Sequence, residues 1–384
     1  MNNIFIVSTI IIASIVIILL IIIIYKVFKK NKVEKNNDFT KINDDNNIKL
    51  FSESNRKHFQ KVEKSYEISY KKISSYYHFK KKNTYRICFG SCNVKPCNKR
   101  IWNNIKSYQP DLWLFLGDNY YNDISTTKGK KVINDGELLI NHFNILEKMK
   151  QNSAFIKFIN EIPSLSIWDD HDYFSNNKDF NVNESAKKLL KNSFLDFFNI
   201  PKDDIRFSRN GIYTYYDLVQ NDTHIVRFFL LDVRSNKNNL DILGEKQWIW
   251  LEKNLKKSSA VINILVSGTT FINNNKHSES WKFTGWSFKK LQELLKINNI
   301  KNIILLSGDL HQGRVVIDEY LIEITSSSLT SKVSKMYTNS DIDEPLKENN
   351  FGFIDIDLDK LIFVGGLINL NNGKQTNLIK FKLL

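Results

Sequence analysis

The sequence of 384 residues is poor in the residues that define fibrous, low-complexity and disulfide-rich proteins. It has only 14 glycines and 5 prolines, which excludes collagen-like and proline-rich chains. Its 3 cysteines, Cys88, Cys92 and Cys97, do not make a disulfide framework and leave an odd thiol, which favours a reducing compartment. Hydrophobic residues make up 42% of the chain and include 26 Phe. The chain can therefore bury a substantial core, and wholesale disorder is excluded.

The net charge of +14 is concentrated near the N-terminus. Residues 26–86 carry a net +10 and residues 87–384 only +4. A basic segment beside a membrane is attracted to anionic headgroups, by about 1 kcal/mol per Lys or Arg near the surface. A merely solvated spacer would have the same composition. No aromatic and basic module accompanies the charge, so we expect no nucleic-acid partner.

An uncharged apolar run extends from Ile4 to Ile24 and is long enough, as a helix, to cross a hydrocarbon layer of about 30 Å. It lacks the basic start and the small-residue cleavage site of a signal peptide. Lysines follow at once, so the positive-inside rule predicts that the rest of the chain is cytoplasmic. The predicted organisation is a transmembrane anchor at residues 1–25, a basic juxtamembrane stalk at 26–82 and one domain at 83–384, in a single-pass membrane protein.

After Asn83, short apolar runs alternate with helical stretches, a pattern typical of a layered α/β fold. The strands that we predict are Tyr85–Gly90, Leu112–Leu116, Ser164–Trp168, Ile225–Leu231, Val261–Val266 and Asn302–Leu306. The predicted helices are Lys99–Tyr108, Asp135–Ile159, Glu184–Phe198, Glu245–Lys257 and Ser287–Lys296. Four alternating runs in the tail predict strands of a second sheet, at Glu319–Thr325, Gly352–Asp357, Leu361–Ile368 and Leu378–Leu383.

Polar clusters follow four of the predicted strands, at Gly90–Asn93, Gly117–Asp123, Trp168–Asp172 and Gly308–His311. Because ligands gather at the carboxyl ends of strands in layered α/β folds, we expect these clusters to converge. A single Asp after a strand is often a helix cap. Three carboxylates and an imidazole in succession, however, repel one another unless a cation or a hydrogen-bond network compensates. The sequence therefore predicts a metal centre, and its oxygen, imidazole and thiolate donors suit iron, manganese, calcium or zinc.

The same motifs resemble those of alkaline phosphatase D-like (PhoD-like) phosphatases, within the calcineurin-like metallophosphoesterase superfamily. The resemblance covers about residues 85–358. It implies a four-layer α-β-β-α sandwich with two metal ions on the strand-end loops, and a phosphoester substrate hydrolysed as a monoester, a diester or both. The motifs that carry it are, in order, Phe89–Asn93, Pro110–Asp123, Trp168–Tyr173, Leu231–Arg234, Leu243–Trp248, Ser307–His311 and Thr325–Thr330.

The resemblance also implies roles for individual residues, by motif position. A hydroxide activated by the metal ions is expected to attack phosphorus in line. His171 would neutralise developing charge or protonate the leaving group. For Arg234, a bond to a phosphate oxygen and an ion pair with a neighbouring carboxylate remain alternatives. The implied metal ligands are Cys92, Asp118, Tyr121, Asp170, Asp309 and His311.

Three positions depart from the family pattern. Phe174 stands in place of a glycine, Asn177 in place of a carboxylate, and Ser331 in place of a histidine. These changes affect the expected substrate rim, and they leave open an alternative: a catalytically silent membrane scaffold or binding protein. His142 lies outside the motifs, and we expect it at the surface.

Overall fold

The computed structural model describes residues 76–78, 83–123, 135–174, 183–220, 223–273, 278–334 and 344–383. The predicted anchor lies outside these residues, as does nearly all of the predicted stalk. Among the residues that are described, no helix is both long and apolar enough to cross a membrane.

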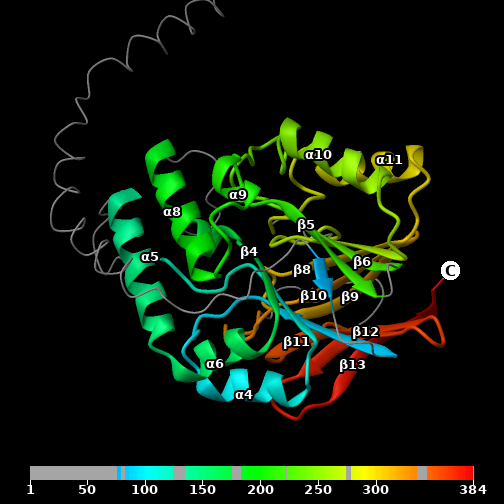
Figure 1. Ribbon diagram of the computed structural model, residues 1–384, viewed down its shortest axis with the longest axis horizontal. Helices are drawn as coiled ribbons and strands as arrows, with labels where there is room; N and C mark the ends of the chain where they lie inside the picture. The colour runs from blue at the N-terminus through cyan, green and yellow to red at the C-terminus, as the bar shows by residue number, and fades with distance from the viewer. Residues whose placement is uncertain are drawn as a thin grey trace, which may run out of the picture. The chain divides into compact units, whose positions relative to one another are not determined.

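Two β-sheets form the centre of the fold (Figure 1). The first sheet contains, in spatial order, β1 (Tyr76–His78), β5 (Thr214–Gln220), β6 (Thr223–Leu230), β7 (Ile262–Val266), β8 (Ile303–Ser307), β10 (Leu321–Ser326) and β9 (Gly313–Asp318). The second contains β13 (Gln375–Lys382), β12 (Ile362–Asn369), β11 (Asn350–Asp357), β2 (Thr84–Gly90), β3 (Leu112–Leu116) and β4 (Ser164–Ile167). Strands β6, β7 and β8 are parallel neighbours in the first sheet, and β2, β3 and β4 are parallel neighbours in the second.

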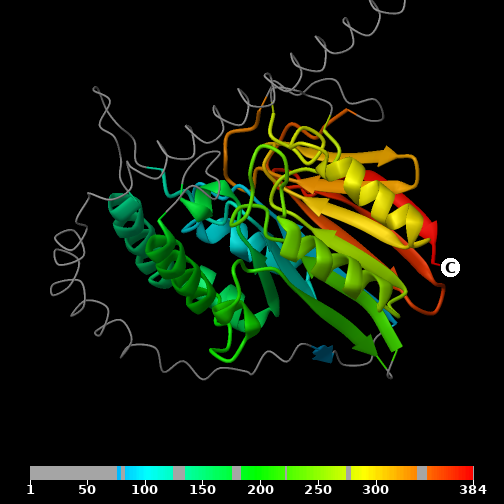
Figure 2. The same cartoon turned by 90° about the horizontal axis from the view of Figure 1, so that it is seen from above.

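A hydrophobic core fills the space between the two sheets. Alternate residues point into it, such as Ile87 and Phe89 of β2 and Val226 and Phe228 of β6, because successive side chains of a strand face opposite sides. The opposite side of the first sheet packs against α10 (Glu245–Lys256) and α11 (Ser287–Ile297). Figure 2 shows these two helices lying over the strands of that sheet.

Helices also cover the outer side of the second sheet. They are α4 (Lys99–Ser107) and α6 (Ser153–Glu161). The ring of Trp102 in α4 lies with its centroid 6.0 Å from that of Phe115 in β3 and 5.0 Å from that of Phe158 in α6. The order helix, sheet, sheet, helix is visible in Figure 1 and agrees with a metallophosphoesterase-like sandwich.

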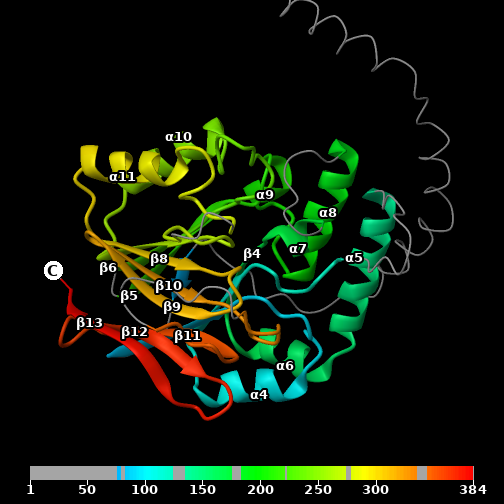
Figure 3. The same cartoon turned by 180° about the vertical axis from the view of Figure 1, so that it is seen from behind.

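Further helices lie beside the sheets, and one of them carries residues of the predicted site (Figure 3). They are α5 (Asp135–Lys150), α7 (Asp170–Tyr173), α8 (Glu184–Phe197) and α9 (Ile205–Ser208). Helix α7 begins directly after β4, and Trp168 between them contacts Phe194 of α8 with ring centroids 5.4 Å apart.

One prediction about these elements is wrong, and another is correct only in part. The single helix expected over Asp135–Ile159 is two helices, because the side chain of Asn152 caps α6 by accepting a hydrogen bond of 2.8 Å from the backbone N–H of Phe155. Of the tail strands predicted for a second sheet, β11, β12 and β13 lie in the second sheet, where β11 pairs antiparallel with β2. Strand β10 instead pairs in parallel with β8 of the first sheet.

The prediction that His142 lies at the surface is also wrong. Its side chain is fully buried in α5. The ring Nδ1 lies 3.1 Å from the hydroxyl of Tyr120, and Nε2 lies 2.7 Å from Oγ of Ser193. Both ring nitrogens therefore have partners inside the protein, which makes burial of the imidazole possible.

Candidate metal centre

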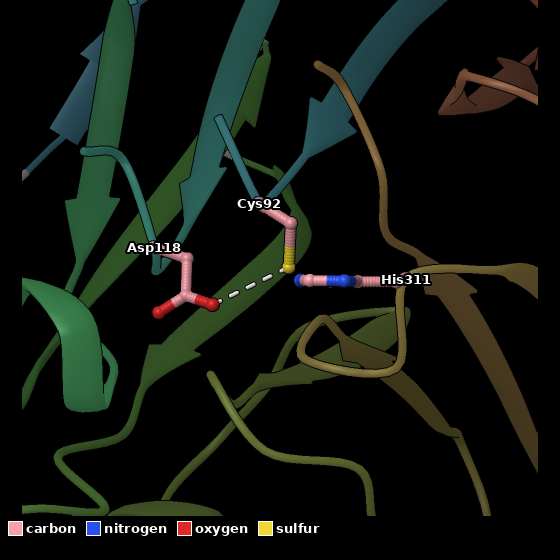
Figure 4. A group of neighbouring side chains, drawn as sticks. All are labelled: Cys92, Asp118 and His311. Carbon is pink, nitrogen blue, oxygen red and sulfur yellow. Dashed lines mark hydrogen bonds between the residues drawn. The ribbon is translucent and has the colours of Figure 1, made fainter. Parts of the chain in front are cut away.

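The carboxyl ends of four strands bring their polar residues together. Cys92 follows β2, Asp118 follows β3, Asp170 and His171 open α7 after β4, and His311 follows β8 from the other sheet. Figure 4 shows Cys92, Asp118 and His311 pointing toward one another from these separate loops. The convergence predicted from the strand ends therefore occurs for these residues.

One group of donors surrounds Cys92. Its Sγ lies 3.4 Å from Oδ2 of Asp118. The hydroxyl of Tyr121 lies 3.3 Å from the same Oδ2 and 2.8 Å from Nε2 of His311. Ligand atoms of Cys92, Asp118 and His311 all lie within 4.8 Å of one another, which is close enough for a single ion to contact them.

A second group of donors shares Asp118. Ligand atoms of Asp118, Asp170 and His171 also lie within 4.8 Å of one another. Asp118 therefore contributes a ligand atom to both donor groups. Asp309 follows β8 as predicted, and burial, followed by the charges of Asp169 and Asp170, raises its pKa well above the ordinary value. Its carboxyl oxygens belong to neither of the two donor groups found among the described residues.

The environment of Asp118 suits a cation. The residue is only 1% exposed, and its Oδ1 has no hydrogen-bond partner among the described residues. Burial, and then the charges of Cys92 and Asp170, raise the pKa of this carboxyl well above the ordinary value. A buried acceptor without a donor is costly unless something positive approaches it, so the donor set fits a metal ion.

Cys92 is surrounded by groups that stabilise its thiolate. Burial alone would raise the pKa of the thiol, but hydrogen bonding and charge from His311, with hydrogen bonds from Ser327 and Ser91, lower it to about 6. The hydroxyl of Ser327 donates to Sγ over 3.0 Å. A thiolate is the form of cysteine that binds metals.

Four of the predicted ligands have a left-handed backbone. The φ angles are 57° at Cys92, 49° at Asp118, 73° at Asp309 and 55° at His311. This conformation costs roughly 1–2 kcal/mol for an ordinary L-residue and less for Asp and His. Such strain persists where the surroundings impose it, and it concentrates at functional sites.

The run from Asp169 to Asp172 separates into residues with different contacts. Asp169 accepts a hydrogen bond of 2.5 Å from Nε of Arg234, and Asp172 accepts one of 2.9 Å from the backbone N–H of Asn119. Asp170 belongs to the second donor group, with Asp118 and His171. His171 hydrogen-bonds through Nδ1 to Oδ2 of Asp123, and although burial opposes it, this contact together with the charge of Asp170 raises the pKa of the imidazole.

Arg234 lies within the protein and is 0% exposed. Besides Asp169 it contacts Glu279 and Thr269, two residues that sequence reasoning missed. Thr269 stands in a polar run just after β7, a strand end of the same kind as the four that were recognised. Glu279 lies in a loop without any sequence pattern. Among the departures from the family pattern, Phe174 and Ser331 are both buried, and Asn177 lies outside the described residues.

The two sheets with their flanking helices, together with donors at the carboxyl ends of the strands, are consistent with a metallophosphoesterase-like sandwich. Residues 219–355 match the family described as PhoD-like phosphatase. This match confirms the predicted resemblance and supports a metal-dependent phosphoric ester hydrolase. Arg234, Asp309 and His311 fall within the matched residues, and Cys92, Asp118 and Asp170 come to the same place from earlier strands.

Solved structures show the same fold. A structure of PhoD is 15% identical in sequence, with 78% of this chain and 70% of that chain covered and a TM-score of 0.58. The purple acid phosphatase PPD1 from seeds of yellow lupin (Lupinus luteus) is 13% identical, with 79% and 54% covered and a TM-score of 0.53. A search of curated proteins gave no match.

Proposed function

We propose that this protein hydrolyses phosphomonoesters, phosphodiesters or both with two bound metal ions. The observation that carries the proposal is the membership of Asp118 in two donor groups, one with Cys92 and His311 and the other with Asp170 and His171. Ions bound there would polarise the phosphate oxygens and lower the pKa of a water molecule toward neutrality.

The side chains have separate tasks in this proposal. Cys92, Asp118, Tyr121 and His311 would hold one ion. Asp118 and Asp170 would hold the other, together with Asp309, which the family resemblance implies as a ligand and which lies outside the two donor groups. His171 acts as the proton donor to the leaving oxygen. Its Nδ1 is engaged with Asp123, which orients the ring and leaves Nε2 for the substrate.

Hydrolysis by the full chain tests the proposal. We expect turnover of an aryl phosphate or of a bis-aryl phosphodiester, loss of turnover with a chelator, and loss in the Asp118→Asn variant. Asp357→Asn is a suitable control, because Asp357 forms an ion pair with Lys360 and lies opposite Thr84, at the end of β2 away from Cys92. A folded protein loaded with metal but inactive on both substrates would contradict the proposal.

The alternative of a silent scaffold predicts a different metal content. Its support is the set of changed rim positions, Phe174, Asn177 and Ser331. Two tightly bound metal ions per chain would count against a scaffold, and fewer than one would favour it.

We also propose that residues 1–25 anchor the protein in a membrane and that the basic stalk faces the cytoplasm with the enzyme domain. The apolar run and the lysines that follow it support this topology. The sequon at Asn183 provides a test, because its side chain caps α8 at an exposed position. Glycosylation of Asn183 in cells would place the domain on the opposite side of the membrane.

A further inference from the structure

Every nitrogen of the Arg234 guanidinium has a partner within the protein. Nε donates to Oδ1 of Asp169 over 2.5 Å, Nη1 donates to Oε1 and Oε2 of Glu279 over 2.9 and 3.1 Å, and Nη2 donates to Oγ1 of Thr269 over 2.9 Å. The side chain is 0% exposed. A guanidinium in this state would have to break its own ion pairs before it could bind a phosphate oxygen.

Asp169, the first partner, is fixed from several directions. A Cβ atom added at Gly117 would lie 2.7 Å from Cβ of Asp169, and one added at Gly268 would lie 2.6 Å from its Cγ. The backbone N–H of Asp169 donates to Oδ2 of Asp172 over 3.0 Å. Because Asp170 is the next residue along the chain, any displacement of Asp169 passes directly to that predicted metal ligand.

Glu279 holds the opposite end of the guanidinium. Its side chain is 14% exposed, and its Oε1 also forms an ion pair of 2.9 Å with Nζ of Lys237. The cations Arg234 and Lys237 balance the anions Asp169 and Glu279. Removal of one partner would leave a buried charge uncompensated, which is strongly unfavourable.

The network reaches the metal centre without bonding to it. Nη2 of Arg234 lies 4.0 Å from Oδ1 of Asp170, too far for a hydrogen bond but close enough for electrostatic attraction. Oδ1 of Asp170 instead accepts the backbone N–H of His171 over 2.9 Å. Arg234 thus acts on the start of α7, where Asp170 and His171 lie.

We infer that Glu279, Arg234 and Asp169 form a positioning network that holds α7, and with it Asp170 and His171, in place for metal binding and proton transfer. Arg234 is then a positioning residue and does not touch the phosphate. The inference rests on the proposed function for its kinetic consequences, and its effect on metal binding can be measured without any turnover.

The variant Glu279→Gln tests the network, because it removes the charge and keeps the size of the side chain. In the full chain loaded with metal, we expect kcat to fall about 10–100-fold, as is typical of outer partners of metal ligands. KM for an aryl phosphate and the inhibition constant of inorganic phosphate should each change less than about twofold, because ground-state binding is intact. Titration with Mn²⁺ alone should show roughly a 10-fold loss of affinity at one of two sites.

Arg234→Lys separates positioning from direct phosphate binding. A lysine keeps the charge but cannot bond to Asp169, Glu279 and Thr269 at once, so its effects should match those of Glu279→Gln. The opposite result would overturn the inference: a large rise in KM and in the phosphate inhibition constant for Arg234→Lys, with Glu279→Gln close to the wild type.

A matched control is available in the pair of Arg227 and Asp217. This pair is also buried and bidentate, at 2.6 and 2.7 Å, and it joins β5 to β6 away from the predicted site residues. Arg227→Lys should lower stability and leave Mn²⁺ affinity unchanged. If Glu279→Gln behaved in the same way, the network would be merely structural and the inference wrong. If the wild type bound Mn²⁺ but hydrolysed nothing, the proposed function would fail, and the Mn²⁺ affinities would still decide the inference.

Discussion

Asp172 Oδ1 accepts a hydrogen bond of 2.9 Å from the backbone N–H of Asn119, and this contact joins the loop after β3 to the helix after β4. Its Oδ2 also accepts the backbone N–H of Asp169 over 3.0 Å. Asn119 directly follows Asp118, and Asp172 lies two residues after Asp170. A single carboxylate therefore fixes the relative position of two predicted metal ligands.

The variant Asp172→Asn should damage both stability and metal binding. An amide nitrogen in place of one oxygen would face backbone donors instead of accepting from them. We expect the free energy of unfolding to fall by about 1.5–3 kcal/mol, the range for hydrogen bonds to charged groups, and Mn²⁺ affinity to fall about 10–100-fold. Urea denaturation and metal titration measure the two effects. Unchanged Mn²⁺ affinity would show that Asp172 does not set the spacing of the ligands.

Asp118→Asn should have opposite effects on the stability of the metal-free and the metal-loaded protein. Without metal, burial, and then the charges of Cys92 and Asp170, raise the pKa of the Asp118 carboxyl. Neutralising it should stabilise the metal-free protein near neutral pH, because a raised pKa destabilises the fold once the carboxyl is ionised. Metal should then stabilise the wild type and not the variant.

Thermal unfolding with and without chelator checks this pair of expectations. The wild type should lose stability on chelation, whereas the unfolding temperature of Asp118→Asn should not respond. A metal-free variant less stable than the metal-free wild type would indicate that the contacts of Cys92 and Tyr121 with Oδ2 of Asp118 contribute more to stability than burial of the charge costs.

Gly268→Ala should reduce activity through a steric effect on Asp169. The added Cβ would lie 2.6 Å from Cγ and 2.8 Å from Oδ1 of that side chain, so the carboxylate must move. We expect a fall in kcat of at least about 10-fold with the fold retained, measured by steady-state kinetics and circular dichroism. Gly365→Ala is a control in β12, where the three atoms nearest to the added Cβ belong to the side chains of Ile324 and Phe363. It should affect stability and spare kcat; equal loss in both variants would argue against a specific effect.

Local patterns predict the elements of this fold better than the pairing between them. The apolar run Leu112–Leu116 is β3 with the same bounds, and Ser287–Lys296 differs from α11 by one residue at its end. The pairing of β10 with β8 and of β11 with β2 joins segments that are far apart in the sequence. Partners of this kind are chosen by packing across the whole core, which no local alternation of residues encodes.

In the site, too, local sequence predicts the single segments better than the contacts between them. Residue types at strand ends indicate that Asp118 and Asp170 can meet, since the parallel strands β3 and β4 end at a common edge. His311 reaches them from β8 of the other sheet. Sequence could not assign Asp169 to Arg234 and Asp170 to the metal centre, because both are carboxylates in adjacent positions. It also gave no sign of Glu279, which reaches Arg234 from a loop. That contact depends only on tertiary structure.

His142 illustrates a signal that was present in the sequence. Helix α5 buries Leu138, Leu139, Leu146 and Met149, and His142 lies on the same stripe at spacings of three and four residues. An imidazole fits this apolar stripe because Tyr120 and Ser193 satisfy its two nitrogens. The helical spacing of the apolar residues in α5 therefore indicates burial of His142 more reliably than the polarity of its side chain does.

Burial of His142 makes the fold sensitive to acid. Burial lowers the pKa of this imidazole to about 3, whereas in the unfolded chain it is about 6.5. Between these values the unfolded state binds a proton that the folded state does not, so stability falls as the pH falls, by about 1.4 kcal/mol per pH unit. His142→Gln removes this titration. The stability advantage of the wild type over the variant, measured by urea denaturation at pH 8, should shrink by about 2 kcal/mol at pH 5.

Ser193→Ala provides the control for this pH dependence. The variant loses the hydroxyl that lies 2.7 Å from Nε2 of His142 but retains the titrating imidazole. Its stability should be lower than that of the wild type at both pH values, and it should fall with acidification at least as steeply. Groups other than His142 titrate in both proteins and cancel in the comparison. If the difference between the wild type and His142→Gln were the same at pH 8 and pH 5, the imidazole would be able to take up a proton without unfolding, and the acid sensitivity would arise elsewhere.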